Sequence, residues 1–354
     1  MIVDQWIPAA HRGDAVGDSA RLMRRMLRAD GHTSDIYSLT IDDDLRGDVL
    51  PFREGETRRA DVTIYHYALP SPLSAPFARL PSGRVLLYHN VTPERFFAPY
   101  DAGIFALARA GRQELRTLAN VPDLALGVSE FNRRELEEMG FQHSAVLPLA
   151  VDLARLTEAP PRPAVTKMLT DDWANILFVG RIAPNKRIED HIFLAEHYKR
   201  YVDERYRFVF VGRYDAVPSY YASIRALIAR FRMRPERFVF TGPLPDADLA
   251  AVYRASHAYV SLSEHEGFCA PLAEAMAMDV PIMAYAAGAV PETLGGAGLL
   301  ITSKDYELAA ELLTQVIYDE DLRRRVIEGQ RARLPFFSAE RVAAGLRSVL
   351  ARLS

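Results

Sequence analysis

Two carboxylates frame a turn-forming stretch in the C-terminal half of the chain. Glu266 precedes a glycine, and Glu274 follows Pro271, a residue suited to the first helical turn because its missing N–H is not needed there. Helix-initial N–H groups can bind a phosphate or sugar hydroxyls, and two carboxylates can grip different hydroxyls of one ligand. Taken alone, Glu274 could instead only complement the helix dipole. The positions expected to contact a ligand through this turn are Gly267, Phe268, Cys269, Ala270, Pro271 and Leu272.

A glycine and two cations follow a predicted strand at 176–179. Gly180 allows a sharp turn, Arg181 can place its planar fork on phosphate oxygens, and Lys186 adds a compact charge about one helical turn later. Lysine is rare here, with four among 43 basic residues, although an arginine-favouring genome is the simpler account of that ratio. Together the two cations could neutralise a diphosphate leaving group, whereas an ordinary solvated loop is the alternative.

The first loop, between a predicted strand at 2–6 and a predicted helix at 20–29, carries Gly13 and Gly17. Ser19 is the expected helix cap. The two glycines permit close approach of the backbone to a ligand, so both are candidate donor-binding positions. The G-x-x-x-x-G-K-[ST] pattern of P-loop phosphoryl transfer does not occur in the chain.

Short apolar runs alternate with amphipathic helical stretches along the chain, which predicts parallel sheets built from βαβ units. With 354 residues, the chain is long enough for two such domains. The proline-rich segment 158–163 indicates a linker. We therefore expect an α/β fold of two Rossmann-like domains with parallel sheets that face a central cleft. The expected domains are 1–163 and 164–335, with a helix at about 336–354 that can pack back on the first. The predicted strands are 2–6, 35–39, 62–65, 85–88, 124–128, 145–147, 176–179, 208–211, 238–241, 259–262, 282–284 and 299–301.

Composition narrows the class of protein further. The chain is 49% hydrophobic and 25% charged, with a net charge of −3, which makes nucleic acid a poor candidate partner. Cys269 is the single cysteine, so an internal disulfide is excluded. The sequence shows neither an apolar run of the ~18–20 residues that a membrane span needs nor a signal-peptide pattern at Met1. These features predict a cytoplasmic protein.

The ordered set of motifs resembles glycosyltransferase family 4, the large retaining family with the GT-B architecture. Glu266 and Glu274 match its E-x7-E pattern, and Gly180-Arg181 with Lys186 matches its G-R-x4-K element. Three further segments are similar to its motifs: 128–131 (V-S-E-F), 147–152 (L-P-L-A-V-D) and 288–292 (G-A-V-P-E). Leu149 and Ala150 replace the usual Asn and Gly, and Ala289 replaces the second glycine.

The resemblance implies a role for each matching residue. Arg181 and Lys186 would hold the donor diphosphate, Glu274 the ribose and Glu266 the transferred sugar. His89 matches a histidine that lines the reaction centre, which makes it a catalytic candidate with Arg181, Lys186 and Glu266. The resemblance also implies retention without a covalent intermediate, with no metal ion and no cofactor besides the nucleotide-diphosphate sugar, a UDP- or GDP-sugar, as co-substrate. Asp42–Asp44 and Asp246 are accordingly interpreted as loop and cap residues.

The acceptor side is less defined. Asn90, Phe96 and Phe97 follow His89 and could contact a saccharide or lipid-linked acceptor of surface polysaccharide or glycoconjugate synthesis. Arginine faces at 21–28 and 109–116 could attract an anionic membrane surface at the inner leaflet, or could simply be solvated. A nucleotide-sugar 2-epimerase and a non-catalytic nucleotide-sugar binding protein remain open as alternatives. The sequence leaves the oligomeric state, the donor base, the donor sugar and the linkage open.

Overall fold

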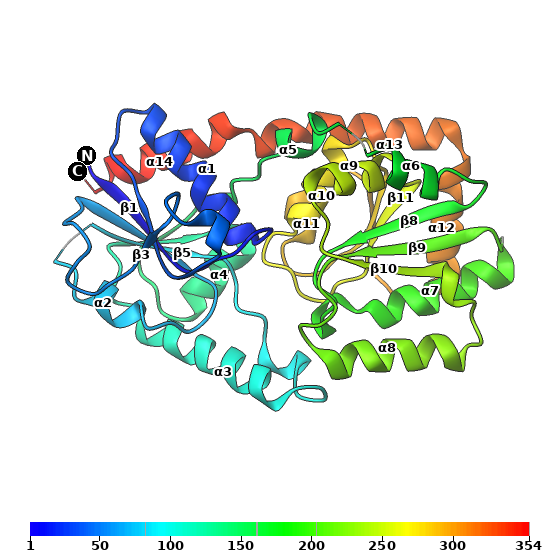
Figure 1. The fold of residues 1–354 in the computed structure, drawn as a ribbon, viewed down its shortest axis with the longest axis horizontal. Helices are drawn as coiled ribbons and strands as arrows, with labels where there is room; N and C mark the ends of the chain where they lie inside the picture. Colours follow the sequence, from blue (N-terminus) through cyan, green and yellow to red (C-terminus); the bar gives the residue numbers. More distant parts are fainter. Residues whose placement is uncertain (82, 161, 203, 354) are drawn as a thin grey trace. The chain divides into compact units, whose positions relative to one another are not determined.

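The computed structural model describes residues 1–81, 83–160, 162–202 and 204–353. Two compact units divide the chain, each built on one parallel sheet (Figure 1). Unit 1 comprises Met1–Ala98, Ala102–Asp152 and Pro335–Ser354, and unit 2 comprises Pro99–Asp101 and Leu153–Leu334.

Unit 1 holds a seven-stranded sheet in the order β3-β2-β1-β4-β5-β6-β7. Helices α1 and α14 contact each other, and Figure 1 shows them on one side of this sheet with α2 and α3 on the other. The strands are β1 Val3–Ala10, β2 Ile36–Ile41, β3 Leu50–Pro51, β4 Val62–Tyr67, β5 Arg84–Tyr88, β6 Leu124–Gly127 and β7 Ser144–Val146. The helices are α1 Ala15–Ala29, α2 Ser74–Ala78, α3 Ala102–Thr117, α4 Glu130–Glu138 and α14 Ala339–Ala351, with 3-10 turns at Asp43–Leu45 and Glu94–Phe96.

Unit 2 holds a six-stranded sheet in the order β10-β9-β8-β11-β12-β13, with helices on both faces (Figure 1). The strands are β8 Ala174–Val179, β9 Tyr206–Val211, β10 Phe238–Gly242, β11 Ala258–Ser261, β12 Ile282–Tyr285 and β13 Leu299–Ile301. The helices are α5 Ala154–Thr157, α6 Pro163–Leu169, α7 Ile188–Tyr201, α8 Pro218–Arg230, α9 Asp246–Arg254, α10 Ala270–Ala277, α11 Val290–Leu294, α12 Tyr306–Tyr318 and α13 Glu320–Arg333.

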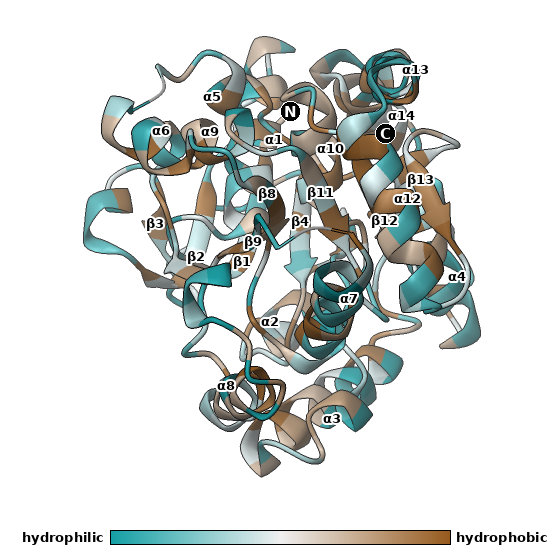
Figure 2. Ribbon diagram, turned by 90° about the vertical axis from the view of Figure 1, so that its right-hand side faces the viewer, coloured by the Kyte–Doolittle hydropathy of each residue, from teal (hydrophilic) through white to brown (hydrophobic). Residues whose placement is uncertain are grey.

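The apolar composition of the strands explains their position inside each unit. Every residue of β4 is buried, as is every residue of β11, which is expected for parallel strands that are covered by helices on both faces. Polar residues turn outward on the covering helices, and Figure 2 shows α13 largely in hydrophilic colours.

Both sheets reverse their strand order at one point. In unit 1 the reversal lies between β1 and β4, and in unit 2 it lies between β8 and β11. In doubly wound sheets, ligands bind outside the carboxyl ends of the strands at such a switch point. The loops after β1, β4, β8 and β11 are therefore the places where a ligand site is expected.

Several local predictions need correction. Helix α1 begins at Ala15 and is capped by Asp14, whose carboxylate accepts a hydrogen bond from the Gly17 N–H, so Ser19 is not the cap. The short strand β3 ends in a proline and was not predicted, because two residues are too few for a periodic pattern. By contrast, the serine of the 128–131 motif does cap a helix: the Ser129 hydroxyl accepts from the Asn132 N–H at the start of α4.

The boundary between the two units lies after Asp152, eleven residues before the predicted boundary at 163, because the segment that follows packs with the rest of unit 2. Arg254 donates to the backbone carbonyls of Leu156, Thr157 and Ala159 and thereby binds this segment to α9. Within the predicted linker, Pro163 opens α6, and Pro161 lies outside the described residues.

Candidate functional site

A buried ion pair lies at the switch point of unit 2. Lys186, in the loop after β8, donates to both carboxylate oxygens of Glu266, in the loop after β11, at 2.7 Å each. The Lys186 side chain is 18% exposed and that of Glu266 is 7% exposed. Two of the predicted site residues are thus brought together across the point at which the strand order reverses. The pair offers an ammonium and a carboxylate side by side, which suits a ligand that carries both phosphate and hydroxyl groups.

Backbone contacts fix the loops that carry this pair. Asn185 donates through Nδ2 to the His265 carbonyl at 3.1 Å and accepts from the Glu264 N–H at 2.9 Å. The Glu266 carbonyl accepts from the Ala289 N–H at 2.9 Å. A Cβ on Gly288 would lie 2.3 Å from that same carbonyl oxygen, so only glycine fits there. The 288–292 motif therefore has a packing role, because Gly288 and Ala289 hold the backbone of Glu266 in place.

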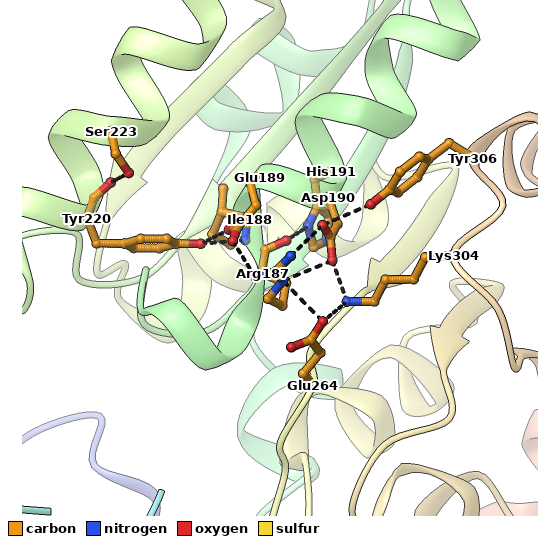
Figure 3. Close-up of polar contacts among 10 residues, drawn as sticks. All are labelled: Arg187, Ile188, Glu189, Asp190, His191, Tyr220, Ser223, Glu264, Lys304 and Tyr306. Atoms are coloured by element: carbon orange, nitrogen blue, oxygen red, sulfur yellow. Dashed lines mark hydrogen bonds and ion pairs between the residues drawn. The ribbon is translucent and has the colours of Figure 1, made fainter. Parts of the chain in front are cut away.

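A second charged cluster adjoins these loops (Figure 3). At its centre is Asp190, whose side chain is fully buried and which binds Lys304 and, at 2.9 Å, the Tyr306 hydroxyl. Arg187 contacts both Asp190 and Glu264 at 3.3 Å, and Lys304 contacts Glu264 at 2.8 Å. Arg187 directly follows Lys186 in the chain, and Glu264 lies two residues before Glu266. The cluster therefore ties the start of α7 and the β13–α12 loop to both loops of the ion pair.

Glu274 is held by two partners that sequence reasoning missed. Arg155 forms an ion pair with its Oε1, and the Tyr253 hydroxyl donates to its Oε2 at 2.8 Å. Arg155 also pairs with Asp246. Burial, and next the nearby Glu274, raise the pKa of Tyr253 well above its usual value, so this hydroxyl stays a donor. Glu274 is the fifth residue of α10, just past the first turn, and its two side-chain partners give it a role beyond complementing the helix dipole.

The charge of Arg181 is not paired with a carboxylate, in contrast to that of Lys186. Arg181 is exposed and forms no ion pair with any residue that the structure describes. Gly180 adopts a φ of 153° and lies against the end of β9, where a Cβ on Gly212 would come within 2.2 Å of the Gly180 carbonyl oxygen. Close backbone packing thus shapes the turn that presents Arg181.

The turn before α10 has the predicted form. Pro271 lies in the first turn of the helix, and Cys269 precedes it in the left-handed region with a φ of 67°. Burial, together with the charge of Glu266, raises the pKa of the Cys269 thiol well above its usual value, so the thiol is neutral. Phe268 is buried and its carbonyl accepts from the Thr293 hydroxyl at 2.5 Å.

In unit 1, His89 follows β5 and joins a short chain of side chains. Its Nε2 lies 2.9 Å from Nδ1 of His66, whose Nε2 lies 3.0 Å from Oε1 of Gln5. His66 is the fifth residue of β4, and Gln5 lies in β1, so the chain spans the switch point of this sheet. Sequence reasoning missed both partners, because a polar residue inside a strand does not reveal which side chain of a neighbouring strand it contacts.

Two predicted acceptor-side residues serve the fold instead. The Asn90 side chain donates to Asn132 at 2.9 Å and to Glu135 at 3.2 Å, and its backbone has a φ of 85°. Phe97 is a core residue with 8% exposure, which removes it as a stacking surface in this conformation. Phe96 is partly exposed and lies beneath the Arg95 guanidinium, 5.0 Å from it.

The first loop also differs from its predicted use. Gly13 has a φ of 69°, with open space where a side chain would be, as a ligand-facing turn requires. Gly17 lies inside α1, and its N–H is bonded to Asp14. Gly17 is therefore part of the helix start rather than of a ligand loop.

A known protein family matches most of unit 2. The family model of glycosyl transferases group 1 matches residues 169–333. We call residues 169–333, just under half of the chain, the group 1 region. Arg181, Lys186, Glu266 and Glu274 all lie in this group 1 region, whereas His89 lies outside it.

Two relatives and one solved structure extend the comparison. The chain is 25% identical to the O-antigen chain mannosyltransferase B of Escherichia coli over 56% of its own length and 53% of the relative's. It is 28% identical to the GDP-mannose-dependent alpha-mannosyltransferase of Mycobacterium tuberculosis over 71% and 63%. The matches thus span about half to 63% of these relatives. Sucrose-phosphate synthase from Thermosynechococcus elongatus superposes with a TM-score of 0.75 at 17% identity, over 100% of this chain and 99% of that one. The structural likeness confirms the predicted GT-B fold class, and the family model and the relatives agree with the predicted resemblance to a glycosyltransferase.

The arginine faces of α1 and α3 lie in unit 1, outside the group 1 region. Each arginine of the α1 face is paired with an acid: Arg21 with Asp18, Arg25 with Asp152 and Arg28 with Asp35. This face is therefore not an uncompensated cationic surface, although Arg109 and Arg116 on α3 are exposed. Asp246 is the first residue of α9 rather than its cap. Of the helices in the described residues, none is long and apolar enough to cross a membrane.

Proposed function

We propose that this protein is a retaining, metal-independent glycosyltransferase that moves a hexose from a UDP- or GDP-sugar to a saccharide or lipid-linked acceptor. The names of the relatives favour mannose as the hexose and GDP-mannose as the first donor to test. Surface polysaccharide or glycoconjugate synthesis in the cytoplasm is the corresponding process.

The Lys186–Glu266 pair carries the proposal. It is buried at a sheet switch point, and it lies in the group 1 region. A diphosphate that departs from a sugar gains negative charge, and a preorganised cation in a water-poor site stabilises that charge. We assign Lys186 and the exposed Arg181 to the diphosphate, Glu266 to sugar hydroxyls and Glu274 to the ribose. The carboxylate of Glu274 has lone pairs left beyond its bonds to Arg155 and Tyr253, so it can accept further hydroxyls.

A donor panel tests the proposal. The full chain is incubated with GDP-mannose, UDP-glucose and related sugars, with and without simple saccharide acceptors, in excess EDTA. We expect acceptor-dependent release of the nucleoside diphosphate and a product that keeps the anomeric configuration of the donor, read by NMR. Acceptor-independent epimerisation of the sugar would indicate an epimerase, and binding without turnover would indicate a binding protein. Activity that requires added Mn²⁺ or Mg²⁺ would contradict the leaving-group chemistry.

A further inference from the structure

A directed chain of hydrogen bonds crosses the switch point of unit 1. It begins at a backbone carbonyl, that of Ala20 in α1, which accepts from Nε2 of Gln5 at 3.0 Å. A backbone carbonyl can only accept, so the amide nitrogen of Gln5 must face it. The orientation of the Gln5 amide is thereby fixed, and its oxygen faces His66.

The fixed amide sets the tautomer of each histidine in turn. Because Gln5 presents an oxygen, Nε2 of His66 must carry the proton and donate it. A neutral imidazole has one N–H, which leaves Nδ1 of His66 as an acceptor. The facing Nε2 of His89 must then donate. The remaining ring nitrogen of His89, Nδ1, is left as a bare acceptor.

The geometry of the two rings agrees with this assignment. Their planes are within 14° of parallel and their centroids are 5.1 Å apart, whereas the facing nitrogens are only 2.9 Å apart. The rings therefore meet edge to edge, with both nitrogens directed at each other in the ring plane. Burial lowers the pKa of His89 to about 3 and the pKa of His66 well below its usual value, so both rings are neutral at physiological pH.

A separate network holds the backbone around His89. The His89 N–H donates to the Tyr67 carbonyl at 2.9 Å. The following residue, Asn90, is anchored to Glu135, which also accepts from the Tyr88 hydroxyl at 2.6 Å. Nδ1 of His89 forms no hydrogen bond with any residue in the described part of the chain. A ring that is fixed at one nitrogen and along its backbone thus presents one unpartnered acceptor.

We infer that Gln5 and His66 are positioning residues that lock His89 into the Nε2–H tautomer, so that its Nδ1 accepts a hydrogen bond from a saccharide hydroxyl. The lock itself is a property of unit 1 alone. The identity of the hydroxyl rests on the proposed transferase function, because a nucleotide-sugar donor and a saccharide acceptor would both supply such groups.

The tautomer can be measured without any turnover. In the full chain labelled with ¹⁵N-histidine, ring spectra distinguish a bare nitrogen from a protonated one, and His89→Asn and His66→Asn identify the two sets of signals. We expect His89 at pH 7 with Nε2 protonated and Nδ1 bare. A His89 ring that is protonated at Nδ1, or that exchanges between both forms, would overturn the inference in the unmodified protein.

Gln5→Leu tests the lock directly, because it removes the acceptor two links away from His89. Without the amide oxygen, nothing favours Nε2–H on His66, and the His89 signals should change to a mixture of both tautomers. Gln330→Leu is the matched control: Gln330 is also fully buried, but it bonds to Ile282 and Val280 in unit 2. This control should leave the His89 tautomer unchanged. An unchanged His89 in Gln5→Leu would contradict the lock.

Ligand additions then identify the hydroxyl. A shift of the His89 Nδ1 signal with GDP-mannose or UDP-glucose, but not with GDP or UDP, would indicate a donor-sugar hydroxyl. A shift with methyl α-mannoside alone would indicate an acceptor hydroxyl, and no shift with any probe would overturn the hydroxyl site. In Gln5→Leu we expect kcat to fall about tenfold, with donor affinity falling as well only if the hydroxyl belongs to the donor sugar. If His89 has the Nε2–H tautomer but the protein transfers no sugar, the transferase function is refuted and the lock stands. If the protein transfers sugar but His89 has the other tautomer, the lock is refuted and the transferase function stands.

Discussion

The two switch points of this molecule carry different kinds of polar residue. In unit 2, the residues around the switch are charged, with the Lys186–Glu266 pair beside the cluster centred on Asp190. In unit 1, the corresponding position holds the neutral series Gln5, His66 and His89. Both arrangements are largely buried, and most of their polar groups pair with one another, as low-dielectric surroundings require; Nδ1 of His89 is the exception.

The difference matches the two kinds of group on a nucleotide sugar and its acceptor. Diphosphate is an anion whose charge grows as it departs, so cations are useful next to it. Hydroxyls are neutral and need oriented donors and acceptors, which a neutral relay supplies without the cost of desolvating an ion. The same fold element, a strand end at a topological switch, thus carries charged residues in unit 2 and neutral polar residues in unit 1.

Lys186→Ala should produce the largest effect. Loss of a preorganised cation should lower kcat about 10²–10³-fold. It should also lower the free energy of unfolding by ~3–5 kcal/mol, because Glu266 is left buried without its partner. Steady-state kinetics and urea denaturation measure the two effects.

A double variant separates these effects. Lys186→Met with Glu266→Gln removes both charges, so stability should recover while activity stays low. Full activity in Lys186→Ala, with the fold intact, would show that the ion pair has no role in the reaction and that the unit 2 site has been misassigned.

The two carboxylates should respond differently. Glu266→Gln should mainly lower kcat, because the sugar must be held while charge develops, whereas Glu274→Gln should mainly weaken donor binding. We expect each loss to be about tenfold or more, as for a hydrogen bond to a charged group. Tyr253→Phe, which removes one support of Glu274, should have a smaller effect of the same kind. Near-wild-type kinetics for both carboxylate variants would contradict the assigned roles.

Acid should destabilise both units through their buried histidines. The fully buried His191 of α7 has its pKa lowered from 6.5 to about 4 by burial, and His89 has its pKa lowered to about 3. Below pH 6.5 these histidines bind protons in the unfolded chain but not in the folded chain, so the free energy of unfolding decreases as the pH falls toward 4. Each histidine contributes up to ~1.4 kcal/mol per pH unit in that range.

Urea denaturation at several pH values measures this slope. His191→Phe places an aromatic ring among Phe178, Phe208 and Phe210, and it should flatten the dependence. The exposed His143 of unit 1 offers a control, since His143→Gln should leave the slope unchanged. An unaltered slope in His191→Phe would contradict the account of this buried ring.

Much of the architecture could be predicted from the sequence because parallel strands in a covered sheet are short apolar runs. The predicted strand 299–301 coincides with β13, and the other predicted strands overlap an observed strand with ends within a few residues. Strand β1 runs through Pro8 to Ala10, beyond its predicted end at Trp6, because a proline is not expected inside a strand from the sequence pattern alone. The start of α1 was misplaced because Asp14 and Ser19 are both good caps, and only the tertiary structure decides between them.

The site was predictable where charge and turn chemistry coincide in one short segment. Lys186 and Glu266 were predicted as site residues at two strand ends, which the fold brings together, but their direct ion pair was not predicted. The partners of Glu274 and His89 were not predictable, because Arg155 stands far from Glu274 in sequence and a lone histidine in a strand such as β4 carries no signal of its role. Asn90 and Phe97 were misassigned because a polar or aromatic residue near a strand end suits the core as well as a ligand.

Arg181 offers the most direct test of the claim that unit 2 binds a diphosphate. It is exposed and has no ion-pair partner among the described residues, so Arg181→Ala changes the site without leaving a buried charge behind. Calorimetric titration would compare GDP with GMP, and UDP with UMP, in the wild type and in this variant. We predict that the variant binds the diphosphate about 10–100-fold more weakly, the loss of one charge-assisted hydrogen bond, while the monophosphate is little affected. Equal losses for both ligands, or no loss for either, would contradict the account.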